Sequence, residues 1–305
     1  MNSLKKKYSV GLIGGDMRME ILANIVKNNG CPIKIYDIPH PDRFNEDDIA
    51  CTLDGLFATC DVITLPVPVT RDKVNIFAEN TACKVNLNEV IRCSSNFGPK
   101  IIFGGIIPAA IKEGLQYNNH TVIDIFDNAR LIENNAVATA EGALMIAMEN
   151  LQTTITGTKF AVLGFGRIAS HLSKILNDLG GEVTVFARRD DALLKARNLG
   201  YDTVKLEEQY TEEYALNIAC ELDRVSLIFN TVPSVILKRE IIAKMKCRPL
   251  YVELASSPYG MNSKDARELE FNTLYAPSLP GRYSPVSAAN YIFEAICSSL
   301  SSMES

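Results

Sequence analysis

The sequence predicts an α/β protein of two domains, each with helices on both faces of a parallel sheet. Short apolar runs typical of buried strands alternate with helical stretches along the chain, and this alternation favours parallel, doubly wound sheets. One glycine-rich turn between a strand and a helix has the spacing of a dinucleotide-binding turn. A chain of 305 residues is long enough for two such domains.

The stretch from Thr158 to Arg189 carries that turn. Lys159–Leu163 has the length and apolar character of a buried strand, and apolar residues at helical spacing begin directly after the turn. A strand, a glycine turn and a helix within about 30 residues are the context in which this pattern binds a dinucleotide. The turn itself has the G-x-G-x-x-(G/A) form and reads Gly164-Phe165-Gly166-Arg167-Ile168-Ala169.

Three small residues of this turn have separate expected roles. Gly164 permits the tight turn, and Gly166 lets a pyrophosphate reach the backbone N–H groups at the start of the helix. Ala169 allows the helix to pack closely on the strand. The turn therefore predicts a nicotinamide dinucleotide as cofactor.

The second strand of this unit, Glu182–Phe186, ends without the acidic residue that usually binds the ribose hydroxyls of NAD. Ala187-Arg188-Arg189 stands there instead. Two guanidinium groups suit a 2′-phosphate, because arginine forms bidentate, charge-assisted bonds with phosphate. We therefore predict NADP, with NAD as the alternative, and a solvated arginine pair as the competing interpretation.

Composition and charge exclude several classes of protein. Apolar residues make up 47% and charged residues 22% of the chain, and the formal net charge is −5. These values argue against a nucleic-acid or anionic-membrane surface, and no apolar run approaches the 18 or so residues of a membrane span. The eight cysteines form no C-x-x-C pair, so we expect buried thiols in a reducing cytoplasm and no metal site.

Residues 1–137 are predicted to form the first Rossmann-like domain. Its glycine-rich turn, Gly14-Gly15-Asp16, lies between a strand and a helix but lacks the G-x-G-x-x-G spacing. We therefore expect it to face substrate or solvent and to bind no dinucleotide. The expected strands of this domain are 8–13, 33–37, 61–65, 100–103 and 121–125.

The second domain is predicted to span residues 138–283. A helix from Ala138 to Gln152 should open it, with Thr139 as N-cap and Glu141 in the first turn, where the helix dipole favours a carboxylate. A last helix, 284–300, should pack back on the first domain. The remaining strands expected in the second domain are 159–163, 182–186, 201–206, 225–231, 251–254 and 273–276.

Nearly the whole chain resembles the A subunits of the dipicolinate synthase family of spore-forming bacteria. The segments that carry this resemblance are Ile13-Gly14-Gly15-Asp16 with Arg18, Thr139-Ala140-Glu141-Gly142, Val162-Leu163-Gly164-Phe165-Gly166-Arg167, Asn230-Thr231-Val232-Pro233-Ser234, Leu254-Ala255-Ser256 and Ala276-Pro277-Ser278-Leu279-Pro280-Gly281. The chain departs from the family pattern at Ser256-Ser257-Pro258-Tyr259, where a basic residue and a second glycine are expected.

The resemblance implies an NAD(P)-dependent oxidation of a dihydrodipicolinate-type cyclic dicarboxylate to dipicolinate during sporulation. It further implies that the partner is the flavoprotein-like B subunit of dipicolinate synthase and that the location is the mother-cell cytoplasm. We also expect a homo-oligomer.

A dicarboxylate needs at least two groups of donors, which we expect to meet at strand ends in a cleft between the domains. Arg18 and Arg282 are the predicted carboxylate clamps, because guanidinium offers a planar two-donor fork. Thr139, Ser256 and Ser257 are predicted to add hydroxyl donors. We assign catalytic roles to Arg282, to Ser256 and to Glu141, the predicted proton acceptor. The alternatives are a surface ion pair for either arginine and a helix-start acid for Glu141.

The predicted cofactor contacts beyond the glycine turn and the arginines are Thr231, Val232 and Pro233.

Two other functions remain open. A D-2-hydroxy-acid dehydrogenase shares the two-domain plan but uses a histidine as acid and base, and His40, His120 and His171 all lie outside the C-terminal loops where that residue belongs. Aromatising a ring needs no acid to protonate a ketone oxygen, so the synthase is favoured. The third function is a cofactor-binding, non-catalytic subunit of a flavoprotein complex.

Overall fold

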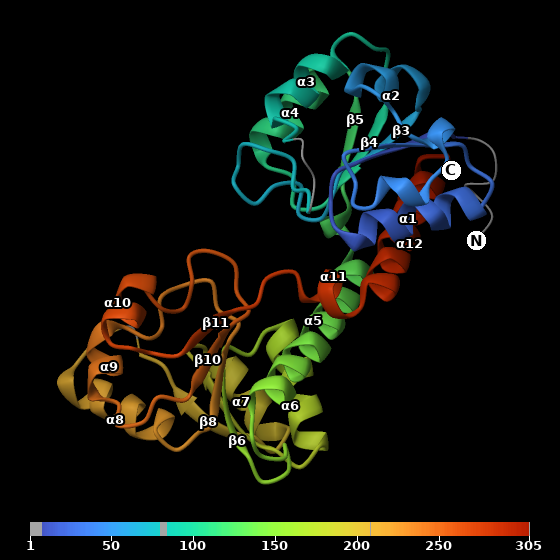
Figure 1. Cartoon of the computed structure of the whole chain (residues 1–305). Coiled ribbons are helices and arrows are strands. Elements are labelled where there is room, and N and C mark those ends of the chain that lie inside the picture. The colour runs from blue at the N-terminus through green and yellow to red at the C-terminus, as the bar shows by residue number, and fades with distance from the viewer. Residues whose placement is uncertain (1–7, 80–83, 208, 305) are drawn as a thin grey trace. The chain divides into compact units, whose positions relative to one another are not determined.

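The computed structural model describes residues 8–79, 84–207 and 209–304 (Figure 1). These residues divide into two compact units. One lies within Met1–Asn135 and Pro280–Ser305, and the other within Ala136–Leu279. We refer to them as the first and the second unit.

The first unit is built on a five-stranded sheet in the order β2-β1-β3-β4-β5. Every neighbouring pair of strands is parallel, and Leu12 pairs with Ile35 on one side and with Thr64 on the other. The connections therefore run in opposite directions from the gap between β1 and β3. The strands are β1 (Val10–Ile13), β2 (Ile33–Tyr36), β3 (Val62–Thr64), β4 (Ile101–Gly104) and β5 (Thr121–Asp124).

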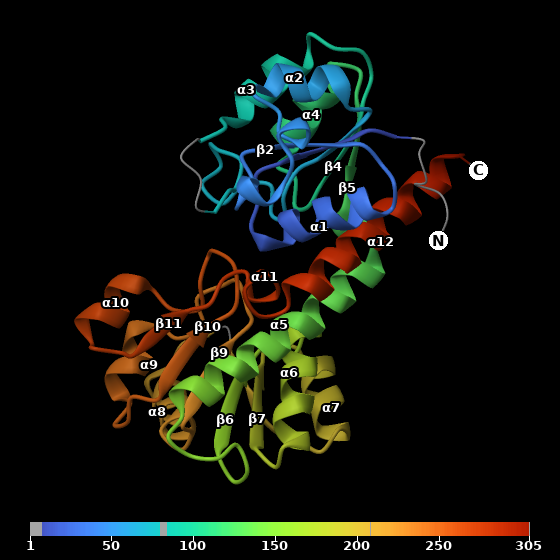
Figure 2. The same cartoon turned by 45° about the vertical axis from the view of Figure 1, so that its right-hand side comes forward.

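Helices cover both faces of this sheet. One face packs against α1 (Met17–Asn28) and α12 (Pro285–Glu304), which lie side by side in both views (Figure 2) and share one apolar core. The other face packs against α2 (Leu53–Thr59), α3 (Leu87–Ser94) and α4 (Ala109–Tyr117). The shorter helices are Pro41–Arg43, Glu46–Asp48, Ile125–Asp127 and α11 (Leu279–Tyr283).

The second unit has a six-stranded sheet in the order β11-β10-β9-β6-β7-β8, and all its neighbouring strands are also parallel. This is the strand order of dinucleotide-binding folds. Its strands are β6 (Lys159–Leu163), β7 (Glu182–Ala187), β8 (Asp202–Lys205), β9 (Leu227–Asn230), β10 (Leu250–Glu253) and β11 (Thr273–Tyr275). Its helices are α6 (Arg167–Asp178), α7 (Asp190–Asn198), α8 (Glu212–Leu222), α9 (Arg239–Lys244) and α10 (Ser263–Glu268).

The predicted fold class of two doubly wound parallel sheets is confirmed, and each expected strand is present. The predicted start of the helix at Ala138 is wrong, because α5 runs from Ala129 to Asn150. Asn128 accepts a hydrogen bond from the Leu131 N–H at 3.0 Å and so caps this earlier start. Thr139 therefore lies inside the helix, and Glu141 is not in its first turn.

The expectation of buried cysteines holds for only part of the set. Cys31, Cys60 and Cys93 are buried, whereas Cys51, Cys220 and Cys247 are exposed. Free cysteine behaves as a small apolar residue and is often buried, but the absence of C-x-x-C pairs carries no information on which cysteines face the core. Cys83 lies outside the described residues.

Candidate functional site

The register of the second sheet brings three loops together at one edge. Leu163 pairs with Phe186 of β7 and with Asn230 of β9, so these three strands end at the same level. The loops that follow begin at Gly164, Ala187 and Thr231. Parallel α/β sheets bind ligands at this edge.

The turn after β6 needs glycine at Gly164. Its φ of +97° is in the region that side chains rarely adopt. A Cβ atom there would lie 2.6 Å from Thr231 Oγ1 and 2.7 Å from Val232 Cγ2. The Gly164 N–H donates to the Phe186 carbonyl at 2.7 Å, so the turn is bonded to β7 and packs closely against the loop after β9.

Gly166 has a different role. It is the N-cap of α6, and an added Cβ would meet no atom of the described residues within 4 Å. The first N–H groups of α6 have no acceptors within the helix, and the helix dipole favours an anion beside them. The open space at Gly166 therefore fits a pyrophosphate.

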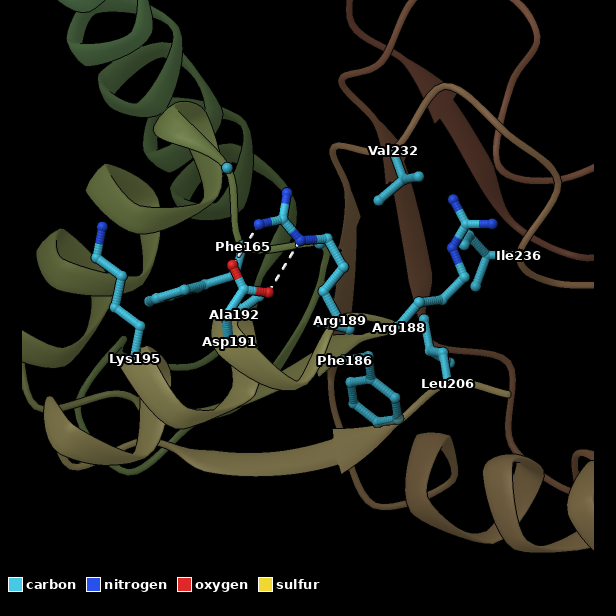
Figure 3. Close-up of a pocket in the computed structure, with 13 residues that line it drawn as sticks. Phe165, Phe186, Arg188, Arg189, Asp191, Ala192, Lys195, Leu206, Val232 and Ile236 are labelled. Carbon is cyan, nitrogen blue, oxygen red and sulfur yellow. Dashed lines mark hydrogen bonds and ion pairs between the residues drawn. The ribbon is translucent and has the colours of Figure 1, made fainter. Parts of the chain in front are cut away.

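A pocket of about 400 Å³ lies against this turn (Figure 3). Leu206 forms part of its wall, because the Leu206 N–H donates to the Ala187 carbonyl at 2.9 Å. Its lining comes from the glycine turn, the end of β7, α7 and the loops after β8 and β9. The lining residues are Gly164, Phe165, Gly166, Phe186, Ala187, Arg188, Arg189, Asp191, Ala192, Lys195, Leu206, Val232 and Ile236.

Three cationic side chains line this pocket: Arg188, Arg189 and Lys195. Arg189 forms a two-point ion pair with Asp191, in which Nε donates at 2.9 Å and Nη2 donates to the other oxygen. Hydrogen bonding to the carboxylate raises the pKa of Arg189 and lowers that of Asp191. The two remaining cations give this end of the pocket a positive excess, which suits phosphate.

Most of the predicted cofactor residues lie together. Gly164, Phe165, Gly166, Ala187, Arg188, Arg189 and Val232 line the pocket, whereas Arg167, Ile168, Thr231 and Pro233 are adjacent to it in sequence. The Thr231 hydroxyl donates to the Leu163 carbonyl at 2.9 Å and so braces the turn. Sequence reasoning missed Lys195, although it lies four residues after Asp191, which places both on one face of α7.

Glu253, the last residue of β10, is a buried carboxylate paired in register with Asn230 of β9. It is 2% exposed and accepts from Asn230 Nδ2 at 2.6 Å and from Tyr251 Oη at 3.1 Å. The Ala255 and Gly260 N–H groups donate to it at 3.0 and 2.8 Å. Burial raises the pKa of Glu253, and these hydrogen bonds oppose the shift.

Asn230 connects this network to the pocket. Its side-chain Nδ2 donates to the Val232 carbonyl at 2.9 Å, and its Oδ1 accepts from the Val232 N–H at 3.2 Å. Glu253 therefore fixes the loop after β9, which forms the pocket wall, as well as the loop after β10.

Replacing Gly260 by alanine should damage this network. A Cβ atom at Gly260 would lie 2.4 Å from both Asn230 Nδ2 and Tyr251 Oη, which donate to Glu253. We expect Gly260→Ala to lower the free energy of unfolding by about 1–3 kcal/mol, the usual cost of overpacking. Chemical denaturation measures the change, with Gly98→Ala as control, because an added Cβ at Gly98 meets no described atom within 4 Å. Equal losses in both variants would contradict the role of the network.

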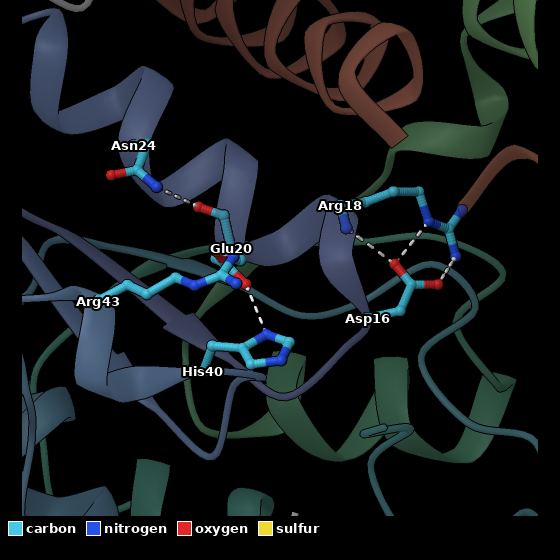
Figure 4. A network of polar contacts seen from close by, with 6 residues as sticks. All are labelled: Asp16, Arg18, Glu20, Asn24, His40 and Arg43. Atoms are coloured by element: carbon cyan, nitrogen blue, oxygen red, sulfur yellow. Dashed lines mark hydrogen bonds and ion pairs between the residues drawn. The ribbon is translucent and has the colours of Figure 1, made fainter. Parts of the chain in front are cut away.

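The first unit holds two of the residues predicted to bind substrate. Arg18 is buried, and its fork is occupied, because Nε and Nη2 donate to Asp16 at 2.8 and 2.7 Å (Figure 4). Nη2 also donates to the Val67 carbonyl at 2.5 Å. This corrects the expectation of an open clamp at Arg18. A Cβ at Gly281 would lie 2.6 Å from Asp16 Oδ2, so α11 packs closely on this pair. Arg282 is exposed, with its guanidinium 4.9 Å from the ring centroid of Tyr283.

Figure 4 also shows Glu20, a carboxylate on α1. Glu20 is 4% exposed and accepts from Arg43 Nη1 at 2.7 Å, and it lies 3.0 Å from His40 Nδ1. His40 thus ties the segment after β2 to α1. His120 is buried, which lowers its pKa. None of the three histidines is among the described residues that line the dinucleotide pocket.

The other predicted substrate residues lie in the second unit. Thr139 is buried on α5, and Glu141 is exposed on the same helix. Ser256 and Ser257 are in the loop after β10, and both are exposed. Within this unit, the loop of Ser256 is anchored through Glu253.

The described part of the chain contains no group of three or more His, Cys, Asp or Glu side chains that could hold a metal ion. No helix in the described ranges is both long enough and apolar enough to cross a membrane.

Two family models match the chain. Residues 9–126 match the N-terminal domain of the dipicolinate synthase A subunit. Residues 122–246 match the NAD-binding domain of the D-isomer specific 2-hydroxyacid dehydrogenases. The second match includes the glycine turn and the pocket lined by Arg188.

Individual proteins resemble the chain over nearly its full length. The A subunit of dipicolinate synthase from Bacillus subtilis (strain 168) is 26% identical over 302 residues, which are 97% of this chain and 96% of that protein. The crystal structure of the corresponding subunit from Bacillus halodurans superposes with a TM-score of 0.81 at 22% identity and covers 97% of this chain and 98% of its own. The crystal structure of the Bacillus subtilis protein also gives 0.81, at 24% identity, and covers 100% and 99%.

These similarities, together with the NAD-binding domain, support an NAD-dependent oxidoreductase. The residues that line the pocket fit the cofactor, because the open space at Gly166 and the cations near Ala187 lie where a dinucleotide needs them. The resemblance to the A subunit of dipicolinate synthase is thus confirmed along nearly the whole chain, and residues 122–246 match an NAD-binding domain of the dehydrogenase type.

Proposed function

We propose that this chain oxidises a dihydrodipicolinate-type cyclic dicarboxylate to dipicolinate, with NADP as the hydride acceptor. The observation that carries the proposal is a dinucleotide pocket in a chain that resembles the dipicolinate synthase A subunit over 97% of its length. In the balanced reaction the dihydro ring loses one hydride to NADP and one proton to a base. The products are dipicolinate, NADPH and the proton.

When NADP is bound, its oxidised nicotinamide ring would be the hydride acceptor. The glycine turn and the start of α6 hold the pyrophosphate, and the wall at Val232 orients the cofactor. Arg282 binds a substrate carboxylate, and Ser256, Ser257 and Thr139 provide hydroxyl donors. The exposed carboxylate of Glu141 accepts the ring proton. Arg18, paired with Asp16, holds the loop at Val67 in place and so positions the part of the first unit that faces the substrate.

The preference for NADP rests on the cations at the end of β7. Arg188→Ala and Arg189→Ala should each weaken NADP binding by about tenfold or more and change NAD binding little, because only NADP carries the 2′-phosphate. Asp191→Asn should favour NADP further, since it releases Arg189 from its ion pair. Fluorescence titration with both reduced cofactors measures the ratio. If the ratio stays constant in all three variants, the arginines form only a solvated pair.

The direct test of the function supplies fresh dihydrodipicolinate and NADP to the purified chain, with and without the B subunit. Formation of dipicolinate and NADPH in equal amounts by the chain alone supports the proposal. Cofactor binding without turnover until the B subunit is added would favour a non-catalytic role for this chain. Oxidation of D-2-hydroxy acids in place of the cyclic substrate would favour the dehydrogenase alternative. The match of residues 122–246 to a 2-hydroxyacid dehydrogenase domain is the reason to test these substrates.

The assembly belongs to the same proposal. By resemblance, the flavoprotein-like B subunit of dipicolinate synthase binds this chain in the mother-cell cytoplasm, and the chain forms a homo-oligomer. Co-expression followed by size-exclusion chromatography with light scattering tests both points. Separate elution of the two proteins at micromolar concentration would contradict a stable complex.

A further inference from the structure

The first unit has a topological switch point of its own, separate from the pocket at Gly166. In an open parallel sheet, ligands bind outside the carboxyl ends of the strands where the connections diverge. In the order β2-β1-β3-β4-β5 this point lies between β1 and β3. The loops that flank it are the Gly14–Arg18 turn and the segment from Leu65 to Glu79.

These two loops form one connected structure. The Gly15 N–H donates to the Phe77 carbonyl at 2.7 Å, and the Glu79 N–H donates to the Gly15 carbonyl at 2.8 Å. Arg18 donates from the start of α1 to the Val67 carbonyl. The backbone at the switch point is therefore fixed before any ligand arrives, which lowers the entropic cost of binding.

Arg71 projects from the second of these loops. Its guanidinium carbon lies 3.7 Å from the ring centroid of Phe77, a cation–π contact that holds its planar face. Burial lowers the pKa of Arg71, Glu79 and Asp16 oppose that shift, and Arg18 adds to it. The residue itself is exposed, so a ligand can reach the guanidinium, and the electrostatic influence of Asp16 and Arg18 on it places that pair nearby. A carboxylate bound there would stabilise the charged guanidinium.

A small pocket of about 170 Å³ lies beside Arg71, and Lys84 is a second cation in its wall. The acid in this wall is Asp72, whose carboxylate accepts from the Val74 and Asn75 N–H groups at 2.8 and 2.7 Å. These bonds lower the pKa of Asp72 and use its oxygens within the turn. The pocket lining is Arg71, Asp72, Asn75, Ile76, Phe77, Ala78 and Lys84.

We propose that Arg71 binds one carboxylate of the dicarboxylate substrate at the switch point of the first sheet. The proposal rests on the proposed function and adds a substrate-binding residue to it. Arg71 suits the role better than Arg18, because Arg71 is exposed in the wall of a pocket, whereas Arg18 is buried. A guanidinium can hold both oxygens of one carboxylate, which a lysine cannot.

The test measures binding of dipicolinate to the full chain by isothermal titration calorimetry. Arg71→Ala should weaken binding by about ten- to a hundredfold, and Arg71→Lys should recover only part of the loss. Affinity for picolinate, which has one carboxylate, should fall less than affinity for dipicolinate, and NADP affinity should stay at its wild-type value. Arg92→Ala on α3 is the matched control, because Arg92 is an exposed arginine of the same unit outside these loops.

The outcomes separate this inference from the proposed function. If the wild type forms dipicolinate and Arg71→Ala binds it with unchanged affinity, Arg71 is not a substrate ligand, although the function stands. If the wild type neither binds nor forms dipicolinate, both proposals are overturned. Equal losses in Arg71→Ala and Arg92→Ala would show a general effect of charge and would also overturn the role of Arg71.

Discussion

Gly166→Val should abolish dinucleotide binding without unfolding the protein. The backbone at Gly166 is extended, with φ −86° and ψ −165°, so a β-branched residue fits it. Its Cβ would enter the open space beside the start of α6. Loss of two charge-assisted hydrogen bonds from pyrophosphate to backbone would cost ~3–6 kcal/mol, or more than about a hundredfold in affinity.

Two other glycines make the measurement specific. Gly98→Val should keep wild-type affinity for NADPH, because Gly98 also has open space around it but lies in the first unit. Gly164→Val should lose affinity together with stability, because its side chain would collide with Thr231 and Val232. Fluorescence titration and thermal unfolding distinguish the three. Undiminished binding by Gly166→Val would place the pyrophosphate elsewhere.

The residues of the dinucleotide pocket that could be predicted are those that directly follow strands. Gly164, Ala187 and Val232 come after apolar runs, and parallel strands end at one edge, so sequence order alone brings them together. Whether Lys195 reaches the pocket depends on the rotation of α7 about its axis, and whether Leu206 reaches it depends on where β8 ends. The alternation of apolar residues in the strands predicts neither of these.

The start of α5 was not predictable from the same signals. Thr139 followed by Glu141 has the pattern of a helix start, but the preceding residues from Ala129 also form helix, and the true cap is Asn128. Where a helix continues through residues that could also cap it, tertiary packing determines where it begins. Ala136, Ala138 and Ala140 are all buried, so α5 is packed on both sides of Thr139 and gains from continuing through it.

Arg18 shows a further limit. An aspartate before a helix predicts an N-cap, and Asp16 does accept from the Arg18 N–H at 3.1 Å. The Asp16–Arg18 pair is buried partly because Gly281 of α11 packs directly against both side chains. That contact joins opposite ends of the chain, so an arginine that seemed open in the sequence is enclosed in the structure.

Asp16→Ala should cause the largest loss of stability, because it leaves Arg18 buried without its counter-charge. Asp16 and Arg18 are 3% and 4% exposed, and breaking a buried pair from one side typically costs about 3–5 kcal/mol. Asp16→Asn should cost less, since the amide oxygen keeps the cap on α1. In the double variant Asp16→Ala, Arg18→Met, much of the loss should be recovered, because no unpaired charge remains.

Hydrogen–deuterium exchange locates the effect. Amides of α1 and of the loop around Val67 should lose protection in Asp16→Ala, while those of β6 and β7 in the second unit should keep theirs. Asp178→Ala provides the control, because its ion pair with Lys174 is solvent-exposed and should contribute little. If Asp16→Ala is as stable as the control, water must reach Arg18 despite Gly281. In that case Arg18 would again be a candidate to bind the substrate carboxylate directly, and its role would have to be measured beside that of Arg71.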